Sequence, residues 1–405
     1  MKKKFSVLVL LTGYPPEHAG AGKRIHNQYK RLKRNNPSIE WFVVTKCESM
    51  ATKFCHGPES IFTVPVEKNH ALPKIFQILV EFAWATFTSH FGILKNIDAI
   101  HVVGFGYYML PIVYFGRKRG LPIIREMVTT GDVGKKQSIG ASLTRILNKL
   151  SSAFIAISPK IKNDFQNTSV GGSKICVLRP NPVDTGKFFP PSNVMRNAAI
   201  DYINDRFPQA NLGHKDIIVG MLGRIRKSKG QDLLIDAIAK LPENYKLLIV
   251  GPTFEGDIFL QTLRDRVTSN HIAHRVLIID ELWSDPSVFY NSLDVFAFSS
   301  LDEGLGNVLL EALCCGIPIA CFEDVGGNDW LIKNGVNGYL SKRSNIEFAR
   351  AIENASALKI VNTQVTKYKK MFSPQAIDMM LLRLLKNSRN TNIHKNSYDS
   401  VNLLS

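Results

Sequence analysis

A repeated alternation of short apolar runs and longer amphipathic segments constrains the fold most strongly. FSVLVLL at 5–11 and AIHVVG at 99–104 are examples of such runs, and the alternation restarts at 216–223 with DIIVGMLG. The pattern is typical of βαβ units, in which parallel strands are covered by helices. Because 405 residues also exceed one ordinary core, the sequence predicts an α/β protein of two consecutive doubly wound domains.

The apolar runs predict the strands. We expect them at 5–11, 40–46, 99–104, 121–127, 153–158 and 174–179, and then at 216–223, 246–251, 275–280, 295–300 and 317–322. A polar, proline-containing stretch at 190–213 suits an interdomain connection. Ligands of doubly wound sheets bind beyond the carboxyl ends of the strands, so the loops that leave those ends are the candidate sites.

The N-terminus favours a buried strand over a signal peptide, because the apolar run at 5–11 is short and ends in Tyr-Pro-Pro without a small-residue cleavage site. No apolar run is long enough to cross a bilayer. The six cysteines show neither metal-ligand spacing nor a secreted framework, which indicates reduced thiols in the cytosol.

The net charge of +17 is concentrated in the first half of the chain. Residues 1–190 hold 27 Lys and Arg against 11 Asp and Glu, whereas residues 191–405 hold 24 against 23. This asymmetry predicts attraction to an anionic surface or substrate, such as an anionic membrane surface, although each basic cluster can equally be a solvated helix face. Nucleic acid is disfavoured as a partner, because the bases are not interleaved with stacking aromatics. The apolar segment at 71–94 predicts a mostly buried helix, with a membrane-interface helix as the alternative.

Three loops at strand ends suit a phosphorylated ligand. In TGYPPEHAGAG at 12–22, Gly20 and Gly22 precede a helix, where backbone amides can approach an anion. In the second loop, Arg224 and Lys229 follow a strand, and two cations can hold a diphosphate from both sides. Their neighbours Arg226 and Lys227 are interpreted as surface bases. Each loop alone has a plain structural alternative, a turn or a basic surface loop.

The third loop is EGLGNVLLEALCCGIP at 303–318. If a helix begins near Gly306, the amides around 304–307 form an anion site, and Glu311 lies among apolar neighbours about 7 to 8 Å further along the axis. A buried carboxylate is costly without a partner. We therefore interpret Glu311 as the acceptor of hydrogen bonds from a ribose diol.

Taken together, these motifs resemble the GT-B-fold, retaining glycosyltransferases of family 4. The resemblance extends over nearly the whole chain and includes TGYPPEHAGAG at 12–22, IAIS at 155–158, LRPNPVDTGKF at 178–188, the GRxxxxKG loop at 223–230, the segment 293–320 and VGGNDWLIKNGVNGYL at 325–340. It implies two Rossmann-like domains that face each other across a cleft. The acceptor-side domain would be 1–195 and the nucleotide-sugar domain 196–372. In 373–405 a helix would return to the N-terminal domain before a disordered tail.

The resemblance also implies roles for single residues. Arg224, Lys229 and Glu303 would be catalytic: the two cations stabilise the leaving diphosphate, and Glu303 supports the donor sugar. The donor-binding residues would be Gly20, Gly22, Gly223, Gly304, Leu305, Gly306, Asn307 and Glu311. No metal and no cofactor are expected, since the cations replace the metal. Family members transfer sugar with retention of configuration, by front-face attack of the acceptor hydroxyl.

The sequence departs from the family pattern at two places. The acceptor-side histidine expected after 121–127 is absent, and Glu126, Thr129 or Asp132 could take its role. The common GGxxE pattern becomes Gly-Gly-Asn-Asp-Trp at 326–330. Both departures concern sugar specificity.

The sequence thus predicts a cytoplasmic, hexosyltransferase-class glycosyltransferase, peripheral on the inner face of the membrane. It would move a sugar from a UDP- or GDP-sugar to a glycan or lipid-linked acceptor for surface polysaccharide or glycolipid. Two alternatives stay open: a nucleotide-sugar epimerase of the same architecture and a non-catalytic nucleotide-sugar-binding subunit.

Overall fold

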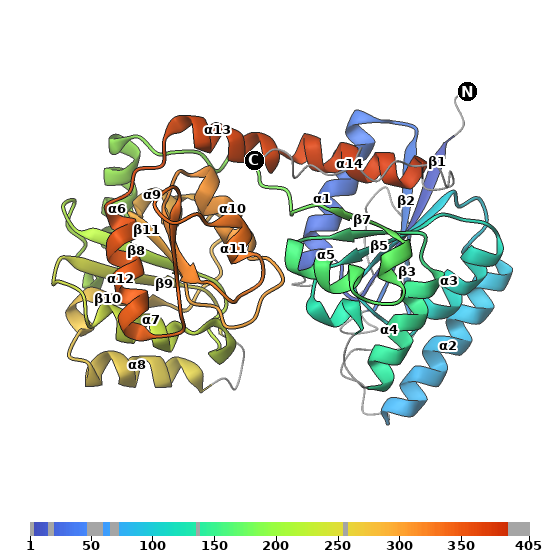
Figure 1. The fold of residues 1–405 in the computed structure, drawn as a ribbon, viewed down its shortest axis with the longest axis horizontal. Helices are drawn as coiled ribbons and strands as arrows, with labels where there is room; N and C mark the ends of the chain where they lie inside the picture. Colours follow the sequence, from blue (N-terminus) through green and yellow to red (C-terminus); the bar gives the residue numbers. More distant parts are fainter. Residues whose placement is uncertain are drawn as a thin grey trace. The chain divides into compact units, whose positions relative to one another are not determined.

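The chain folds into two compact units (Figure 1). The computed structural model describes residues 4–14, 20–46, 60–64, 73–134, 138–253 and 258–387. Unit 1 comprises Met1–Pro180 and Pro374–Ser405, and unit 2 comprises Asn181–Ser373. Cys47, Cys55, the middle of the first glycine loop at 15–19 and the expected tail from 388 onward lie outside the described residues.

Within the described residues, unit 1 contains a seven-stranded parallel sheet of order β3-β2-β1-β4-β5-β6-β7. Its strands are β1 Phe5–Leu11, β2 Ile39–Lys46, β3 Ser60–Val64, β4 Ala99–Val103, β5 Ile123–Met127, β6 Ala153–Ala156 and β7 Ile175–Leu178. The central strands are buried on both faces, which explains why they appear in the sequence as continuous apolar runs.

Helices cover both faces of this sheet. They are α1 Gly20–Asn35, α2 Lys74–Phe91, α3 Met109–Lys118, α4 Ile139–Leu150, α5 Pro159–Gln166 and α14 Pro374–Asn387. On one face, Ile25, Tyr29 and Leu32 of α1 and the leucines of α14 share a core with β1. Helix α14 is fixed to α1 by an ion pair between Arg31 Nε and Asp378 Oδ2 at 2.8 Å. The C-terminal helix is therefore part of unit 1.

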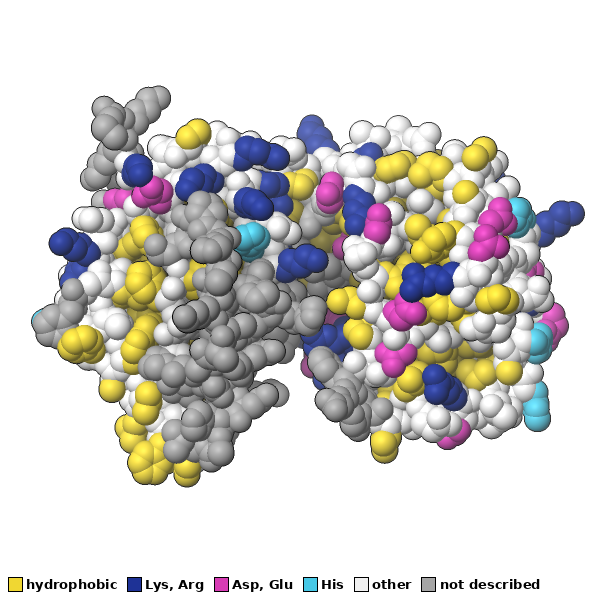
Figure 2. Space-filling view, turned by 180° about the vertical axis from the view of Figure 1, so that it is seen from behind, with side chains coloured by type: hydrophobic (Ala, Val, Ile, Leu, Met, Phe, Trp, Pro, Cys, Tyr) yellow, Lys and Arg dark blue, Asp and Glu magenta, His cyan; other side chains and the backbone are white. Residues whose placement is uncertain are grey.

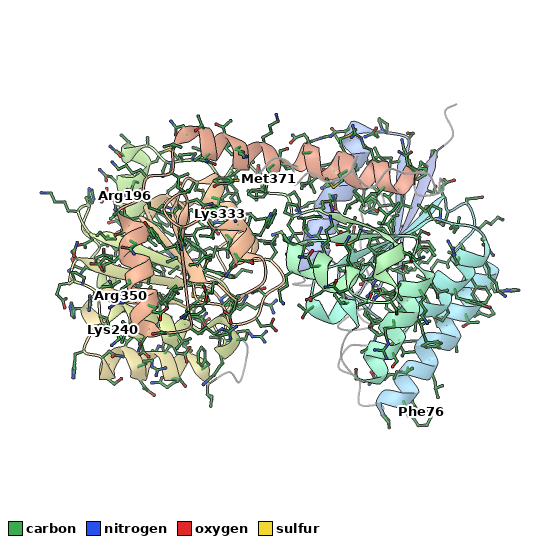
Figure 3. All side chains as sticks on the ribbon, in the orientation of Figure 1. Phe76, Arg196, Lys240, Lys333, Arg350 and Met371 are labelled. Atoms are coloured by element: carbon green, nitrogen blue, oxygen red, sulfur yellow. The ribbon has the colours of Figure 1, made fainter. Side chains whose placement is uncertain are left out.

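Helix α2 differs from the sequence-based expectation of a mostly buried helix. One side packs on the sheet, with Ala85 fully buried, but Phe76 and Phe87 on the outer side are 56% and 64% exposed. Figure 2 shows hydrophobic side chains gathered along one edge of unit 1, and Phe76 points away from the ribbon near the start of α2 (Figure 3). Hydropathy alone does not reveal which face of an apolar helix meets protein.

Unit 2 repeats the architecture with a six-stranded parallel sheet of order β10-β9-β8-β11-β12-β13 among the described residues. Its strands are β8 Ile217–Leu222, β9 Tyr245–Val250, β10 Val276–Ile279, β11 Val295–Phe298, β12 Ile319–Phe322 and β13 Gly338–Ser341. Its helices are α6 Asn193–Arg206, α7 Gln231–Ile238, α8 Phe259–Ser269, α9 Ser287–Ser292, α10 Asn307–Cys314, α11 Asn328–Leu331, α12 Asn345–Ser356 and α13 Asn362–Met371. The predicted class, two doubly wound α/β domains, is confirmed.

The units divide at Pro180, whereas the sequence placed the boundary at residue 195. The stretch at 190–213, interpreted above as a connection, lies inside unit 2 and contains α6. Ser192 caps this helix by accepting a hydrogen bond from the Met195 amide at 3.3 Å. Upstream, the Val183 amide donates to the Phe372 carbonyl at 2.9 Å, which joins the two ends of unit 2.

Candidate functional site

The order of the unit 2 sheet brings two of the predicted loops together. Strands β8 and β11 are neighbours although β9 and β10 intervene in sequence, so the strand order reverses between them. Ligands of doubly wound sheets bind beyond the carboxyl ends of strands at this reversal. The loop with Arg224 and Lys229 leaves β8, and the segment with Glu303 leaves β11.

Lys229 and Glu303 form an ion pair between Nζ and Oε1, across 74 residues of sequence. Their side chains are 23% and 24% exposed, so both remain accessible to a ligand from solvent. The loop is tied to β11 because Ser299 Oγ donates to the Lys229 carbonyl at 3.0 Å and the Leu301 amide donates to the Ser228 carbonyl at 2.9 Å.

Glycines shape this loop. Gly223 has φ 154°, and Gly230 has φ 66°, a left-handed conformation that L side chains rarely adopt. A Cβ at Gly230 would lie 2.2 Å from the Ser299 carbonyl oxygen. The buried Gln231 side chain donates from Nε2 to the Arg224 carbonyl at 2.9 Å, which fixes the backbone beneath the exposed Arg224 side chain.

The third predicted loop forms the N-terminus of α10. The helix begins at Asn307, with Gly306 as its N-cap in extended backbone. Asn181 Nδ2 donates to Asn307 Oδ1 at 2.5 Å, and Leu305 is buried. A Cβ at Gly326 would lie 2.7 Å from the Glu303 carbonyl oxygen and 3.1 Å from that of Gly304, so the backbone at these two residues packs closely on the Gly-Gly turn that follows β12.

Glu311 lies within α10, four residues after the helix start. Its Oε2 accepts a hydrogen bond of 2.7 Å from the Tyr290 hydroxyl. Burial raises the pKa of the Glu311 carboxyl to about 7, although the Tyr290 hydrogen bond and the Lys187 charge lower it. The predicted apolar setting is therefore observed, and the carboxylate has a protein partner, the Tyr290 hydroxyl, that the sequence did not indicate.

Unit 2 thus presents cationic groups at Arg224 and Lys229, backbone amides at the start of α10, and two carboxyl groups at Glu303 and Glu311. Cations and helix N-terminal amides suit an anion such as a diphosphate. Carboxylates accept hydrogen bonds from hydroxyl groups. The site therefore has the chemistry to bind a ligand that carries both a diphosphate and hydroxyls.

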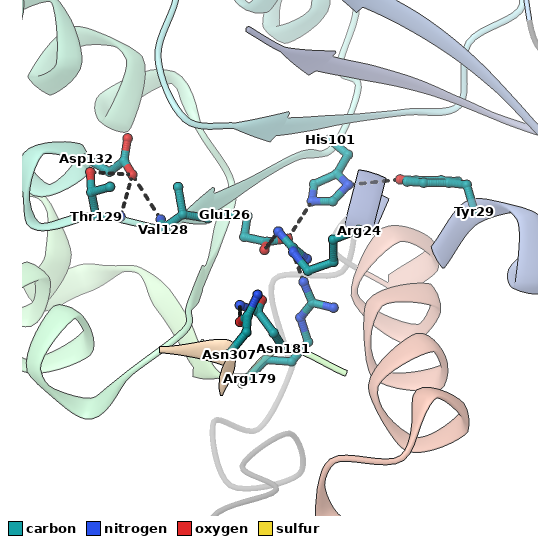
Figure 4. Close-up of polar contacts among 10 residues, drawn as sticks. All are labelled: Arg24, Tyr29, His101, Glu126, Val128, Thr129, Asp132, Arg179, Asn181 and Asn307. Atoms are coloured by element: carbon teal, nitrogen blue, oxygen red, sulfur yellow. Dashed lines mark hydrogen bonds and ion pairs between the residues drawn. The ribbon is translucent and has the colours of Figure 1, made fainter. Parts of the chain in front are cut away.

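In unit 1, the fully buried Glu126 is the centre of a charge cluster (Figure 4). It is ion-paired with Arg24 of α1, and its Oε2 lies 2.5 Å from Arg179 Nη2 and 3.3 Å from His101 Nε2. Tyr29 extends the cluster, with its hydroxyl 3.0 Å from His101 Nδ1.

Burial by itself would raise the pKa of the Glu126 carboxyl, but Arg179, Arg24 and His101 together hold it below its usual range. Burial lowers the pKa of His101. The structure assigns Glu126 to this cluster, and its complete burial does not support direct contact with an acceptor.

The other two residues expected on the acceptor side differ in accessibility. Asp132 is 5% exposed and its Oδ2 accepts hydrogen bonds from the Val128 and Thr129 amides, both at 2.9 Å (Figure 4). Asp132 therefore stabilises the turn Thr130–Val133 after β5. Thr129 is exposed, although its hydroxyl also bonds to Asp132 at 3.1 Å.

The first glycine loop is described only at its ends. Gly20 begins α1, and a Cβ at Gly22 would lie 2.2 Å from the Gly13 carbonyl oxygen. Gly22 is thus required for close packing of α1 on the end of β1, in addition to the diphosphate contact predicted for it.

Sequence reasoning did not identify several residues that contact the candidate site residues. Tyr290 bonds to Glu311, Arg24 and Arg179 pair with Glu126, and Asn181 bonds to Asn307. A tyrosine, arginine or asparagine at these positions carries no local signal, because its partner lies between 21 and 126 residues away.

The described part of the chain contains no cluster of three or more His, Cys, Asp and Glu that could hold a metal ion. Among the same residues, no helix combines the length and the apolarity needed to cross a membrane.

Comparison with known proteins shows that part of unit 2 matches a protein family. Residues 203–372 match the family described as glycosyl transferases group 1. The lipopolysaccharide core biosynthesis glycosyltransferase LpsE of Rhizobium meliloti is 33% identical over 175 residues, which are 42% of this chain and 49% of LpsE.

A second relative, from Campylobacter jejuni, is an N-acetylgalactosamine-N,N'-diacetylbacillosaminyl-diphospho-undecaprenol 4-alpha-N-acetylgalactosaminyltransferase. It is 26% identical over 226 residues, covering 55% of this chain and 56% of that protein. The matched part thus spans about half the length of each of these curated relatives.

The likeness in three dimensions covers more of the chain. Anabaena HepE, solved with UDP and glucose, superimposes with a TM-score of 0.69 at 18% identity, over 95% of this chain and all of HepE. At this identity the likeness shows the fold, and it agrees with the two doubly wound units described above.

Proposed function

We propose that this protein is a retaining, metal-independent glycosyltransferase of family 4. It transfers a sugar from a UDP- or GDP-sugar to a hydroxyl of a glycan or lipid-linked acceptor. The observation that carries the proposal is the ion pair of Lys229 with Glu303, which joins the loops that leave β8 and β11. The loop after β8 also carries the exposed Arg224. These loops lie inside the region that matches the group 1 glycosyltransferase family.

In this proposal, the donor diphosphate lies against Arg224, Lys229 and the amides at the start of α10. When the bond to the anomeric carbon breaks, the departing phosphate oxygen gains negative charge. Fixed cations and amides aimed at that oxygen stabilise the transition state more than the ground state. The two cations supply the charge that a metal ion would otherwise provide.

Glu303 would leave its ion pair with Lys229 when the donor binds. Lys229 then turns to the diphosphate, and the Glu303 carboxylate accepts hydrogen bonds from the donor sugar. Glu311 accepts hydrogen bonds from the ribose diol, with Tyr290 holding its other side. The acceptor hydroxyl attacks from the face that the diphosphate leaves, and the diphosphate oxygen takes its proton. Configuration at the anomeric carbon is thereby retained.

The names of the relatives support the biological setting of the proposal. LpsE is a lipopolysaccharide core glycosyltransferase, and the name of the Campylobacter jejuni enzyme includes a diphospho-undecaprenol. We therefore propose a role in cell-surface polysaccharide or glycolipid synthesis, at the cytoplasmic face of a membrane. The excess of Lys and Arg in residues 1–190 supports contact with anionic lipids there.

The test is sugar transfer by the purified protein with a panel of UDP- and GDP-sugars and lipid-linked or glycan acceptors. Nucleoside diphosphate release that requires an acceptor would support the proposal. Lys229→Ala should lower turnover by about a hundredfold or more, whereas Lys227→Ala in the same turn should leave it unchanged. Donor isomerisation without acceptor, or equal effects of the two variants, would contradict it.

A further inference from the structure

The outer face of α2 is apolar and largely exposed. Ile75 is 65% exposed, Phe76 56%, Leu79 59% and Phe87 64%. Exposed aliphatic and aromatic side chains on neighbouring turns of one helix are unusual in a soluble domain and mark an interaction surface.

The exposed residues form one continuous stripe. At about 100° per residue, positions 75, 76, 79, 80, 83, 86, 87 and 90 fall within an arc of roughly 140°. Only Thr86 and His90 in that arc are polar. The single acid of the helix, Glu81, lies outside the arc and is buried, where it pairs with Lys46 and accepts a 3.3 Å hydrogen bond from the Tyr108 amide. The stripe is therefore uncharged.

The surface around the stripe is basic. Helix α3 packs against α2, and the rings of Phe115 and His90 are 6.1 Å apart. In the described residues 73–134 and 138–150, every Asp and Glu side chain is buried or half-buried. The exposed bases of this region on and beside α2, α3 and α4 are Lys95, Arg117, Lys118, Arg119, Arg145 and Lys149. An apolar stripe on a region whose exposed charges are all basic matches an anionic bilayer.

A cavity of about 380 Å³ opens beside the C-terminal half of α2. Phe42, Phe62 and Phe87 line it together with Lys95. Its apolar lining suits an acyl chain, and the adjacent ammonium group suits a lipid phosphate. This cavity continues the apolar stripe at Phe87.

We propose that the α2 stripe, Ile75, Phe76, Leu79, Val80 and Phe87, inserts into the interfacial region of an anionic phospholipid bilayer. The bases of α3 and α4 then lie at the lipid headgroups. A second copy of this chain is a poorer occupant, because pairing two such faces would bring like charges together. The inference rests on the proposed membrane contact and assigns it to one helix of unit 1.

The experiment is co-sedimentation of the full chain with vesicles of phosphatidylcholine alone or with phosphatidylglycerol added. The double variant Phe76→Glu and Leu79→Glu should weaken binding to the anionic vesicles by at least about tenfold. Both side chains are already exposed, so folding should be preserved. Val194→Glu, at a position 78% exposed on α6 of unit 2, is the matched control and should bind as the unchanged protein does.

A charge variant tests the contribution of the basic residues separately from that of the apolar stripe. Arg117→Glu with Lys118→Glu should weaken binding to anionic vesicles and reduce its dependence on salt. Undiminished vesicle binding by the Phe76→Glu and Leu79→Glu variant would overturn the inference. So would self-association that this variant abolishes, because it would identify a second copy as the occupant.

Nucleotide binding is measured on the same samples. If the Phe76→Glu and Leu79→Glu variant loses vesicle binding but still binds UDP or GDP, the α2 stripe acts in membrane binding and not in donor binding. Vesicle binding without any nucleotide binding would refute the proposed function but leave the α2 surface intact.

Discussion

Replacing Glu311 with glutamine should stabilise the ligand-free protein at alkaline pH while weakening donor binding. Burial raises the pKa of this carboxyl to about 7. Above pH 7 the folded state must hold an ionised carboxylate that its surroundings disfavour, whereas the unfolded chain ionises it freely. Between pH 4.5 and 7 the folded state binds more protons than the unfolded state, so this group lowers stability as the pH rises.

The size of the effect follows from the pKa. A rise from 4.5 to about 7 corresponds to about 3 kcal/mol at pH 8. Glu311 retains partial exposure, and solvent screening reduces the figure, so we expect Glu311→Gln to raise the free energy of unfolding by about 1 to 2 kcal/mol. At pH 5 the gain should be about a quarter as large, because Glu311 is then protonated in the folded state and only partly ionised in the unfolded state.

Thermal unfolding at pH 5 and pH 8 measures this gain. At pH 8 the Tm of Glu311→Gln should exceed that of the unchanged protein by about 3 to 6 °C. Glu353→Gln, at an exposed position of α12, is the control and should give no such gain. The same Glu311 variant should bind UDP or GDP about tenfold more weakly, since an amide accepts fewer hydrogen bonds from a diol. A gain equal at both pH values, or a loss at pH 8, would refute this explanation of Glu311.

Three further predictions concern other parts of the structure. Glu126→Gln should lower the free energy of unfolding by about 3 to 5 kcal/mol in urea at pH 7, because Arg24 and Arg179 lose their buried partner. Since the pKa of Glu126 is lowered in the fold, the stabilisation that this carboxylate provides is complete above pH ~5 and declines at lower pH. An unchanged urea midpoint of Glu126→Gln at pH 7 would contradict this prediction. Gly230→Ala should cost about 2 kcal/mol or more and lower activity, because of its left-handed backbone and its contact with Ser299, and full activity at an unchanged Tm would contradict that. NMR of the product from an α-linked donor should show an α-linkage, and a β-linkage would exclude retention.

The sequence predicted the buried strands well because parallel strands covered on both faces appear as uninterrupted apolar runs. It missed β3 and β13, which are edge strands of the two sheets and have short, mixed sequences. It also missed the polar helix α6, which buries only a few residues. For α2, the sequence contained the apolar residues but not the information about which face the sheet covers.

The sequence could predict those residues of the candidate site that lie on loops at the ends of strands. Lys229 and Glu303 meet because β8 and β11 are adjacent, which the doubly wound order implies. The partner of Glu311 and the pairs of Glu126 were not predictable, because they depend on contacts between distant segments. A buried Glu126 is indistinguishable in sequence from an accessible one at the end of the same strand.

Calorimetric titration of UDP and GDP tests the central claim most directly, namely that the loop after β8 binds the donor diphosphate. The comparison is between the unchanged protein, Arg224→Ala, and Arg226→Ala, an exposed arginine two residues away. Binding of one nucleotide that is weakened about tenfold or more by Arg224→Ala and unaffected by Arg226→Ala is the predicted result. Equal affinities of all three proteins for that nucleotide, or no binding of either nucleotide, would contradict the account.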